Sequence, residues 1–290
     1  MMKLNTFAGA IAALAIALTS HVALAADDAA KRVISVGGAS TEIVYQLGHG
    51  KRLVAVDSTS RVPAAARELP DVGYMRRLSA EPILALEPDL IIAAADAGPV
   101  TVLDQLREAG VKVVSLPGKP SAAGVLDKIE AVAAALGDAD AGKKLKDRVG
   151  AEMEAARIQA RPRVLFLLSI GAGRPPLVGG SETSADGIIN MAGGINAAGE
   201  IQGYKPLSPE AMIAIAPDVL LVTNRSHGMM GGKDSLLSRP EIALSPAGKA
   251  RRVVSMDGGL LLGFGPRTGE AVRVLTEKLR QATAITPAAN

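Results

Sequence analysis

The sequence predicts an α/β protein of two similar lobes, each with a mainly parallel sheet flanked by helices, joined by a long rigid helix. Three observations support this prediction. One segment occurs twice, short apolar strands alternate with helical patterns, and a stretch rich in helix formers lies midway between the two copies. Apolar residues make up 48% of the chain, so it can bury a substantial core.

The repeated segment has a helix-then-strand pattern. "LSAEPILALEPDLIIA" (78–93) aligns without gaps with "LSPEAMIAIAPDVLLV" (207–222). Ser79 and Ser208 are expected to cap the two helices, and a glutamate follows each serine in the first helical turn. The chain then turns at Pro-Asp and enters an apolar strand. Two copies of one unit predict two lobes with the same internal plan.

Other apolar runs predict further strands. "RVISVGG" (32–38) and "RVLFLLSIG" (163–171) are short, branched or leucine-rich, and end in glycine, which is typical of buried strands. "VKVVSLPG" (111–118) has the same character. Because helical patterns separate these runs, we expect parallel sheets with helices on their faces.

The stretch between the two copies predicts the link between the lobes. Residues 121–160 contain a helical pattern, a Gly-Asp break and then a second run of good helix formers that ends before Pro162. This second run could be one more surface helix, but its central place favours a stiff strut. We therefore expect a first lobe over 26–136, a linking helix over 137–161 and a second lobe over 162–290.

The first residues of the chain resemble a secretory signal. Residues 1–25 combine a positive start at Lys3, the apolar run "FAGAIAALAIAL" and the small residues "ALA" at 23–25, after which cleavage is expected. A membrane anchor is the alternative, but the apolar run is short for a span. The chain has no cysteine, so it has no disulfide and no site for a lipid after the signal. We expect a protein free in the periplasm.

Composition and motifs argue against several classes of function. The net charge is only +3 and no basic block stands out, which disfavours nucleic acid as a partner. The glycine pairs match neither a P-loop nor a dinucleotide fingerprint. Beyond the signal, the only histidines are His49 and His227, too few for a bare zinc or manganese ion and for a credible serine hydrolase. We expect a protein that is not an enzyme.

Several motifs together resemble the periplasmic haem-binding proteins of bacterial ABC importers, within the larger set of single-helix-hinge binding proteins that also take vitamin B12 and iron-siderophores. The resemblance covers almost the whole chain after the signal. It implies two lobes joined by a rigid helix, ligand in the cleft and limited motion on binding. The residues that carry it are "GGASTEIVYQLG", "VGYMRRLSAEPILALEPDLIIA", "GYKPLSPEAM", "APDVLLV", "LSPAGKARRVVSMDG" and "LLGFGPRTGEAV".

The resemblance directs attention to "DVGYMRRLSAEP" (71–82), which places a tyrosine beside two arginines in a chain with three tyrosines, three phenylalanines and no tryptophan. A phenolate is a hard oxygen donor that suits ferric haem iron. A guanidinium favours its ionised form. Tyr74 is the expected iron ligand and Arg76 the supporting charge; in an extended stretch the two would project on one side, with Arg77 opposite unless the chain turns. Arg76 or Arg77 is also a candidate partner for a haem propionate.

The second lobe should supply the opposite wall. Tyr204 matches Tyr74 in the repeat but lacks the arginine two residues on, so a ligand contact and a structural role remain equally open. The stretch 223–232 follows a strand and is expected to be a loop at the binding edge. In it, Arg225 is a propionate candidate and His227 is a possible second axial ligand, although a loop histidine is more often simply solvated. Met229 and Met230 could contact the ring.

Some relatives carry a histidine after the first strand of the second lobe and hold a second haem. Here that stretch is "LLSIGAGRPPL", without histidine, which argues against a stacked pair of haems. Arg174 in the same stretch is a weaker propionate candidate.

The paired glutamates of the repeat suggest a different kind of site. Glu81 and Glu210 occupy the same place, one per lobe, and a first-turn glutamate can be explained by the helix dipole alone. The resemblance implies instead that both dock on arginines of a two-subunit permease with its ATPase. It also implies an outer-membrane haem receptor upstream.

Two alternative functions remain open. A binding protein for an iron-siderophore or vitamin B12 would share the fold and the paired glutamates, although siderophore sites usually use more aromatic residues. A secreted hydrolase is the less favoured alternative.

Overall fold

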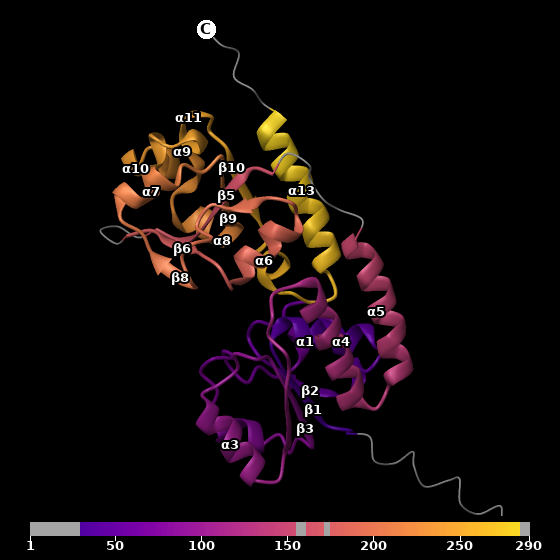
Figure 1. Cartoon of the computed structure of the whole chain (residues 1–290). Helices are drawn as coiled ribbons and strands as arrows, with labels where there is room; N and C mark the ends of the chain where they lie inside the picture. Colours follow the sequence, from indigo (N-terminus) through magenta and orange to yellow (C-terminus); the bar gives the residue numbers. More distant parts are fainter. Residues whose placement is uncertain (1–29, 155–160, 171–174, 285–290) are drawn as a thin grey trace, which may run out of the picture.

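The computed structural model describes residues 30–154, 161–170 and 175–284, which form two α/β lobes (Figure 1). The N-terminal lobe is built on a four-stranded sheet of order β2-β1-β3-β4, and every pair in it is parallel. Its strands are short and largely buried apart from the edge strand β4, as the apolar runs predict. They are β1 (Val33–Val36), β2 (Leu53–Val56), β3 (Leu90–Ala93) and β4 (Lys112–Ser115).

The C-terminal lobe has a six-stranded sheet of order β10-β9-β5-β6-β8, with β7 also paired to β5. The pairs among β10, β9, β5 and β7 are parallel, whereas β6 runs antiparallel to both β5 and β8. The predicted fold class, two lobes with mainly parallel sheets, is therefore confirmed. The strands are β5 (Arg163–Ser169), β6 (Leu177–Gly179), β7 (Ile195–Asn196), β8 (Tyr204–Pro206), β9 (Val219–Thr223) and β10 (Val253–Met256).

Helices cover both sheets. In the N-terminal lobe they are α1 (Gly38–Gln46), α2 (Ala80–Leu84), α3 (Val100–Glu108) and α4 (Ala122–Leu136), with short 3-10 helices η1 (Gly50–Arg52) and η2 (Ala64–Glu68). In the C-terminal lobe they are α6 (Ser184–Met191), α7 (Pro209–Ile215), α8 (Asn224–Met229), α9 (Gly232–Leu237), α10 (Pro240–Ala243), α11 (Pro246–Lys249), α12 (Gly258–Leu262) and α13 (Thr268–Ala284). No helix in the described ranges is both long and apolar enough to span a membrane.

The repeat has the same local structure in both lobes. Glu87 and Ala216, each directly before Pro-Asp, both adopt a left-handed backbone with φ of 46°. This conformation is unfavourable for residues other than glycine, so it marks a turn that the surrounding structure imposes. The turn ends α2 and α7 sharply and sends the chain into β3 and β9.

The aspartate of each turn explains why the repeat keeps it. Asp89 accepts a hydrogen bond from the backbone N–H of Arg32 at 3.0 Å, and Asp218 accepts one from Arg163 at 2.8 Å. Each arginine side chain also donates to a carbonyl oxygen just before the turn, Arg32 to Leu86 at 2.6 Å and Arg163 to Ile215 at 2.9 Å. The turn therefore ties the repeated helix to the first strand of its own lobe.

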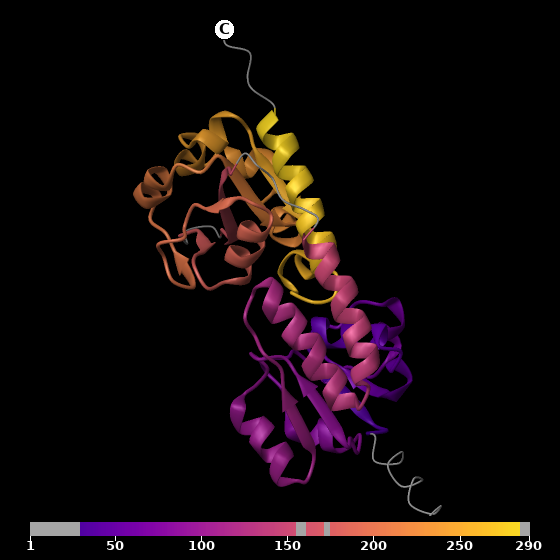
Figure 2. The same ribbon diagram turned by 45° about the vertical axis from the view of Figure 1, so that its right-hand side comes forward.

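The first part of the predicted linking helix, 137–161, is helix α5 (Ala139–Glu154). Residues 155–160 lie outside the described ranges. Asp138 begins this helix by accepting from the backbone N–H of Ala141 at 3.0 Å, and it also bonds His49 Nε2 at 2.9 Å. Along its length α5 packs against α4, and it also contacts α13 of the other lobe (Figure 2). The lobe boundaries at 26–136 and 162–290 stay predictions.

The two lobes share one apolar cluster. It joins residues of β1 and β3 to the inward faces of α4 and α5, and continues through α13 into β5, β9 and β10. The lobes therefore do not have two separate cores. Each lobe has an additional smaller cluster on the other face of its sheet.

Polar contacts reinforce this connection. Arg267, which lies directly before α13, donates two hydrogen bonds of 2.7 Å to the carboxylate of Glu42 on α1. Lys128 Nζ on α4 donates to the carbonyl oxygen of Phe264 at 2.8 Å. A Cβ on Gly265 would lie 3.2 Å from Ala39, so the backbones approach closely there. The "GFGPR" motif (263–267) is thus a contact between the lobes.

We predict that Glu42→Gln lowers the free energy of unfolding by about 2 kcal/mol, because it leaves a partly buried guanidinium without its bidentate partner. Urea denaturation measures this change. The matched control, Glu277→Gln, removes an ion pair with Arg280 on the exposed face of α13 and should leave the free energy of unfolding nearly unchanged. Equal losses in the two variants would contradict the structural role of the Glu42–Arg267 pair.

Candidate functional site

Tyr74 lies on a loop at the carboxyl end of the N-terminal sheet. Residue Asp71 forms a bridge with Val56 at the end of β2, and the Ser58 N–H donates to the Gly73 carbonyl oxygen at 3.0 Å. Gly73 has a φ of +94°, which a residue with a side chain rarely adopts. The following side chain, Tyr74, is 36% exposed, so its ring is open to solvent or ligand.

The chain turns directly after Tyr74. The Arg77 N–H donates to the Tyr74 carbonyl oxygen at 2.7 Å, so 74–77 is a tight turn and the extended alternative is wrong. The turn brings both arginines to the same ring: the guanidinium carbons of Arg76 and Arg77 lie 5.7 and 6.0 Å from its centroid. Two cations therefore flank the Tyr74 ring.

The guanidinium of Arg76 is held between two oxygens. One of its nitrogens donates to the Tyr74 hydroxyl oxygen, and the other donates to the carboxylate of Asp96. Burial acts to lower the pKa of Arg76, but Asp96 and Tyr74 outweigh it and raise that pKa. Arg76 therefore places a permanent positive charge against the phenol oxygen, the atom that would bind a metal.

Asp96 was missed by sequence reasoning. It follows β3 at the carboxyl end of the parallel sheet, where ligands usually bind in α/β folds. Its position after the apolar run "LIIAA" was a usable signal. Its partner lies 20 residues away in sequence, and only the fold brings the two together.

The C-terminal lobe contributes Tyr204 on β8, which is 38% exposed. Burial raises the pKa of Tyr204, while hydrogen bonds from Ala185 and Thr183 and the positive charge of Arg76 act in the opposite direction. The matching tyrosines of the two repeats are therefore both partly exposed, one on each lobe.

The segment after β9 differs from the prediction. Residues 224–229 form the short helix α8 instead of a loop. Thr223 begins the helix by accepting from the Ser226 N–H at 3.0 Å, and the Ser226 hydroxyl donates to the Leu168 carbonyl oxygen on β5 at 2.6 Å. This contact with a distant strand cannot be inferred from local sequence.

The side chains of α8 are placed in different ways. Arg225 is exposed, and Met229 is 76% exposed and so available for a ligand, whereas Met230 is buried in the core of the lobe. His227 Nε2 is shielded from solvent and has no hydrogen-bond partner within the described residues. It is therefore turned away from solvent in this structure, which argues against an axial role. Arg174 lies outside the described residues.

The paired glutamates lie where the repeat predicts. Glu81 and Glu210 are exposed in the first turns of α2 and α7. Bonds from its own backbone N–H and from Ser208 hold the pKa of Glu210 below its usual value. Ser208 caps its helix by accepting from the Ala211 N–H at 3.2 Å, whereas Ser79 makes no such bond, so the predicted capping is correct in one copy only.

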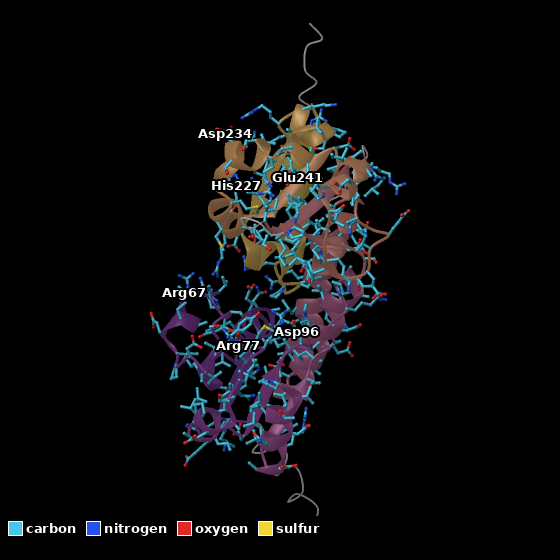
Figure 3. All side chains as sticks on the ribbon, turned by 90° about the vertical axis from the view of Figure 1, so that its left-hand side faces the viewer. Arg67, Arg77, Asp96, His227, Asp234 and Glu241 are labelled. Carbon is cyan, nitrogen blue, oxygen red and sulfur yellow. The ribbon has the colours of Figure 1, made fainter. Side chains whose placement is uncertain are left out.

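The described side chains at the lobe interface can be followed in Figure 3. Arg67, Arg77 and Asp96 lie at the end of the N-terminal lobe that faces the other lobe, and His227 lies within the C-terminal lobe. The N-terminal side of the interface therefore combines the exposed phenol of Tyr74 with guanidinium groups and the carboxylate of Asp96.

Comparison with known proteins identifies the family to which the chain belongs. The family model described as periplasmic binding protein matches residues 33–259. The chain belongs to this family. This periplasmic binding protein is 44% identical to the haem-binding protein RhuT from Roseiflexus sp. RS-1 in its apo form, over 87% of this chain and 98% of that one, with a TM-score of 0.82. It is 43% identical to the haem-binding protein BhuT in complex with two haems, with the same coverage and a TM-score of 0.83.

A relative of different specificity also matches. The vitamin B12-binding protein of Vibrio parahaemolyticus is 28% identical over 251 residues, which cover 85% of this chain and 88% of the relative. The family alone therefore does not select the ligand, and the choice depends on the site.

We predict that Arg76→Gln raises the pKa of Tyr204, because it removes a positive charge that favours the phenolate. The measurement is an ultraviolet titration in a Tyr45→Phe/Tyr74→Phe background. The chain has only three tyrosines, so Tyr204 alone absorbs there as a phenolate. Arg107→Gln, remote on α3, is the control, and an unchanged pKa in the Arg76 variant would show that the two groups do not face each other.

Proposed function

We propose that this periplasmic binding protein captures ferric haem between its lobes and delivers it to an inner-membrane ABC permease. The observation that carries the proposal is the Tyr74 hydroxyl, which accepts a hydrogen bond from Arg76 on the exposed surface that faces the other lobe. The haem-binding proteins RhuT and BhuT, with 44% and 43% identity, support the choice of ligand. Residues 1–25 would direct export and then be removed.

The chemistry of the Tyr74 site suits an iron porphyrin. A phenolate is an anionic oxygen ligand, and tyrosine serves as an axial ligand in some haem proteins. Arg76 would place a permanent positive charge beside the oxygen that binds iron, and Asp96 would keep Arg76 in place. Tyr204 and the exposed Met229 would contact the ring from the C-terminal lobe.

The same arrangement disfavours a corrinoid. Binding of vitamin B12 does not require a metal-binding phenolate, because the cobalt already carries its axial ligands. A guanidinium committed to a tyrosine oxygen is therefore better explained by haem. We also propose that the protein acts as a carrier without catalysis, downstream of an outer-membrane receptor that supplies haem.

We predict that Tyr74→Phe abolishes the phenolate-to-iron charge-transfer band and weakens haemin binding by at least about tenfold, because it removes the ligand oxygen and keeps the ring. Absorption spectroscopy during titration with haemin measures both effects. Tyr45→Phe is the matched control, since Tyr45 packs against the apolar core. An unchanged spectrum in the Tyr74 variant would refute the assignment.

The paired glutamates would dock the carrier on its permease. Glu81 and Glu210 are exposed, one per lobe, at equivalent positions of the repeat, which suits a permease of two subunits. Charged contacts of this kind set the encounter rate and orientation and are screened by salt.

We predict that Glu81→Ala/Glu210→Ala leaves the haemin titration unchanged but lowers haem-stimulated ATP hydrolysis by the reconstituted transporter severalfold, most strongly at low salt. The control, Glu108→Ala/Glu200→Ala, removes two exposed carboxylates at positions that the repeat does not relate. Parent-level stimulation by the first double variant would leave these glutamates with the helix-dipole role only.

A further inference from the structure

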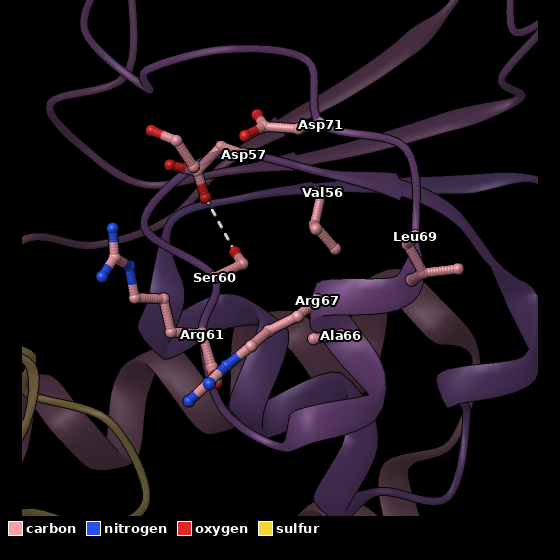
Figure 4. Close-up of a pocket in the computed structure, with 9 residues that line it drawn as sticks. Val56, Asp57, Ser60, Arg61, Ala66, Arg67, Leu69 and Asp71 are labelled. Carbon is pink, nitrogen blue, oxygen red and sulfur yellow. Dashed lines mark hydrogen bonds between the residues drawn. The ribbon is translucent and has the colours of Figure 1, made fainter.

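A second polar site lies beside the Tyr74 loop. It is a cavity of about 250 Å³ at the carboxyl end of β2, between that strand and η2 (Figure 4). Apolar side chains of β2 and η2 form its inner wall. Its polar lining consists of Asp57, Ser58, Ser60, Arg61, Arg67 and Asp71.

Asp57 makes the wall of this cavity rigid. Its carboxylate is 1% exposed and accepts four hydrogen bonds, from the Gly37 N–H at 2.8 Å, the Ser60 hydroxyl at 2.7 Å, and the Thr59 N–H and hydroxyl at 3.0 and 2.7 Å. Its oxygens are therefore satisfied within the turn 57–60. The carboxylate organises the turn and is not a partner for the arginines.

Arg61 and Arg67 supply two charges without a counter-ion. Within the part of the chain that the structure describes, neither guanidinium forms an ion pair, and both side chains are exposed. Arg67 Nε donates to the Arg61 carbonyl oxygen at 2.8 Å, and this bond holds the Arg67 guanidinium through its Nε atom. Figure 4 shows both guanidinium groups on the same side of the cavity. Two adjacent cations of this kind favour an anion with two carboxylates.

Asp71 is the remaining acid at the rim. Its Oδ1 accepts from the Gly73 N–H at 2.7 Å, so this oxygen serves the loop that carries Tyr74. The carboxylate therefore shapes the neighbouring turn, and it leaves the guanidinium groups unpaired.

The cavity and the proposed iron ligand belong to one structural unit. The turn 57–60 contacts the Tyr74 loop on both sides of the tyrosine: the Ser58 N–H bonds the Gly73 carbonyl oxygen at 3.0 Å, and the Thr59 hydroxyl lies 3.9 Å from the Met75 sulfur. A porphyrin bound at Tyr74 would extend several ångströms from its iron. Its edge would then pass over neighbouring residues of this unit.

We propose that Arg61 and Arg67 bind the propionate carboxylates of the haem whose iron is held by Tyr74. This inference rests on the haem-binding function proposed above and refines it. Propionate binding was predicted for Arg76, Arg77 and Arg225, but Arg76 is already committed to Tyr74 and Asp96. The pair Arg61 and Arg67 selects a porphyrin with free carboxylates over a neutral ring of similar size.

The test compares haemin with haem dimethyl ester, which keeps the iron and ring but lacks the two negative charges. The parent protein should bind haemin more tightly than the ester. In Arg61→Ala/Arg67→Ala, haemin affinity should fall by about tenfold for each arginine removed, while ester affinity stays unchanged. The ratio of the two affinities should therefore fall toward one, and Arg61→Lys/Arg67→Lys should recover part of it.

A second probe separates the carboxylates from the iron. Metal-free protoporphyrin IX, followed by its fluorescence, should lose affinity in Arg61→Ala/Arg67→Ala and keep it in Tyr74→Phe. The control, Arg107→Ala/Arg280→Ala, removes the same net charge from exposed helices and should leave all titrations unchanged. Circular dichroism during heating checks that the variants remain folded.

The outcomes distinguish this inference from the function on which it rests. If the parent protein binds neither haemin nor its ester, the proposed haem function is wrong. If the parent binds haemin but the double alanine variant keeps the parent ratio, or loses haemin and ester equally, then haem binding stands and the role of Arg61 and Arg67 is refuted.

Discussion

A continuous apolar core joins the two lobes, and the geometry of the ligand site depends on it. The cluster runs from β1 through α4, α5 and α13 to β5 and β9, so the lobes cannot change their angle without disturbing close packing. The Glu42–Arg267 ion pair and the bond from Lys128 to the Phe264 carbonyl oxygen add polar contacts at the same junction. A flat, rigid ligand that must contact both walls benefits from walls at a fixed separation, because little ordering free energy is lost on binding.

Within the N-terminal lobe, the arginines have distinct tasks that follow from their neighbours. Arg76 is held between a phenol and a carboxylate, so its charge serves the tyrosine oxygen. Among the described residues, Arg61 and Arg67 form no ion pair with a carboxylate, so their charge is available to a ligand. A cation satisfied within the protein contributes less to capture of an anion than one that gains its first counter-charge on binding. The separation of roles therefore depends on Asp96. Because Arg76 is paired with this carboxylate, it is less available to bind a propionate.

The sequence predicted the fold because the repeat carries its own structural constraints. The Pro-Asp turns at Glu87 and Ala216 share a left-handed backbone, and Asp89 and Asp218 bond the strand that precedes each repeat. These are local or repeated features. Tyr74 and Arg76 could be singled out as site candidates from the sequence because motif and neighbourhood coincide there. Asp96, Arg61 and helix α8 were missed because their placement depends on contacts between strands and loops distant in sequence, such as the bond from Ser226 to Leu168.

Ligand and docking residues share one short segment, and this connects capture with delivery in the proposed function. The turn 74–77 leads directly into α2, where Glu81 lies in the first turn. Two backbone bonds, from Leu78 to Gly98 at 2.9 Å and from Gly98 to Met75 at 2.8 Å, tie this segment to the loop that carries Asp96. A force applied to α2 by a docked permease would therefore reach Arg76 and its carboxylate partner through a few bonds. Any loss of that pairing would release Arg76 from its place beside the Tyr74 oxygen, so the segment proposed to hold haem also offers a short route by which docking could loosen it.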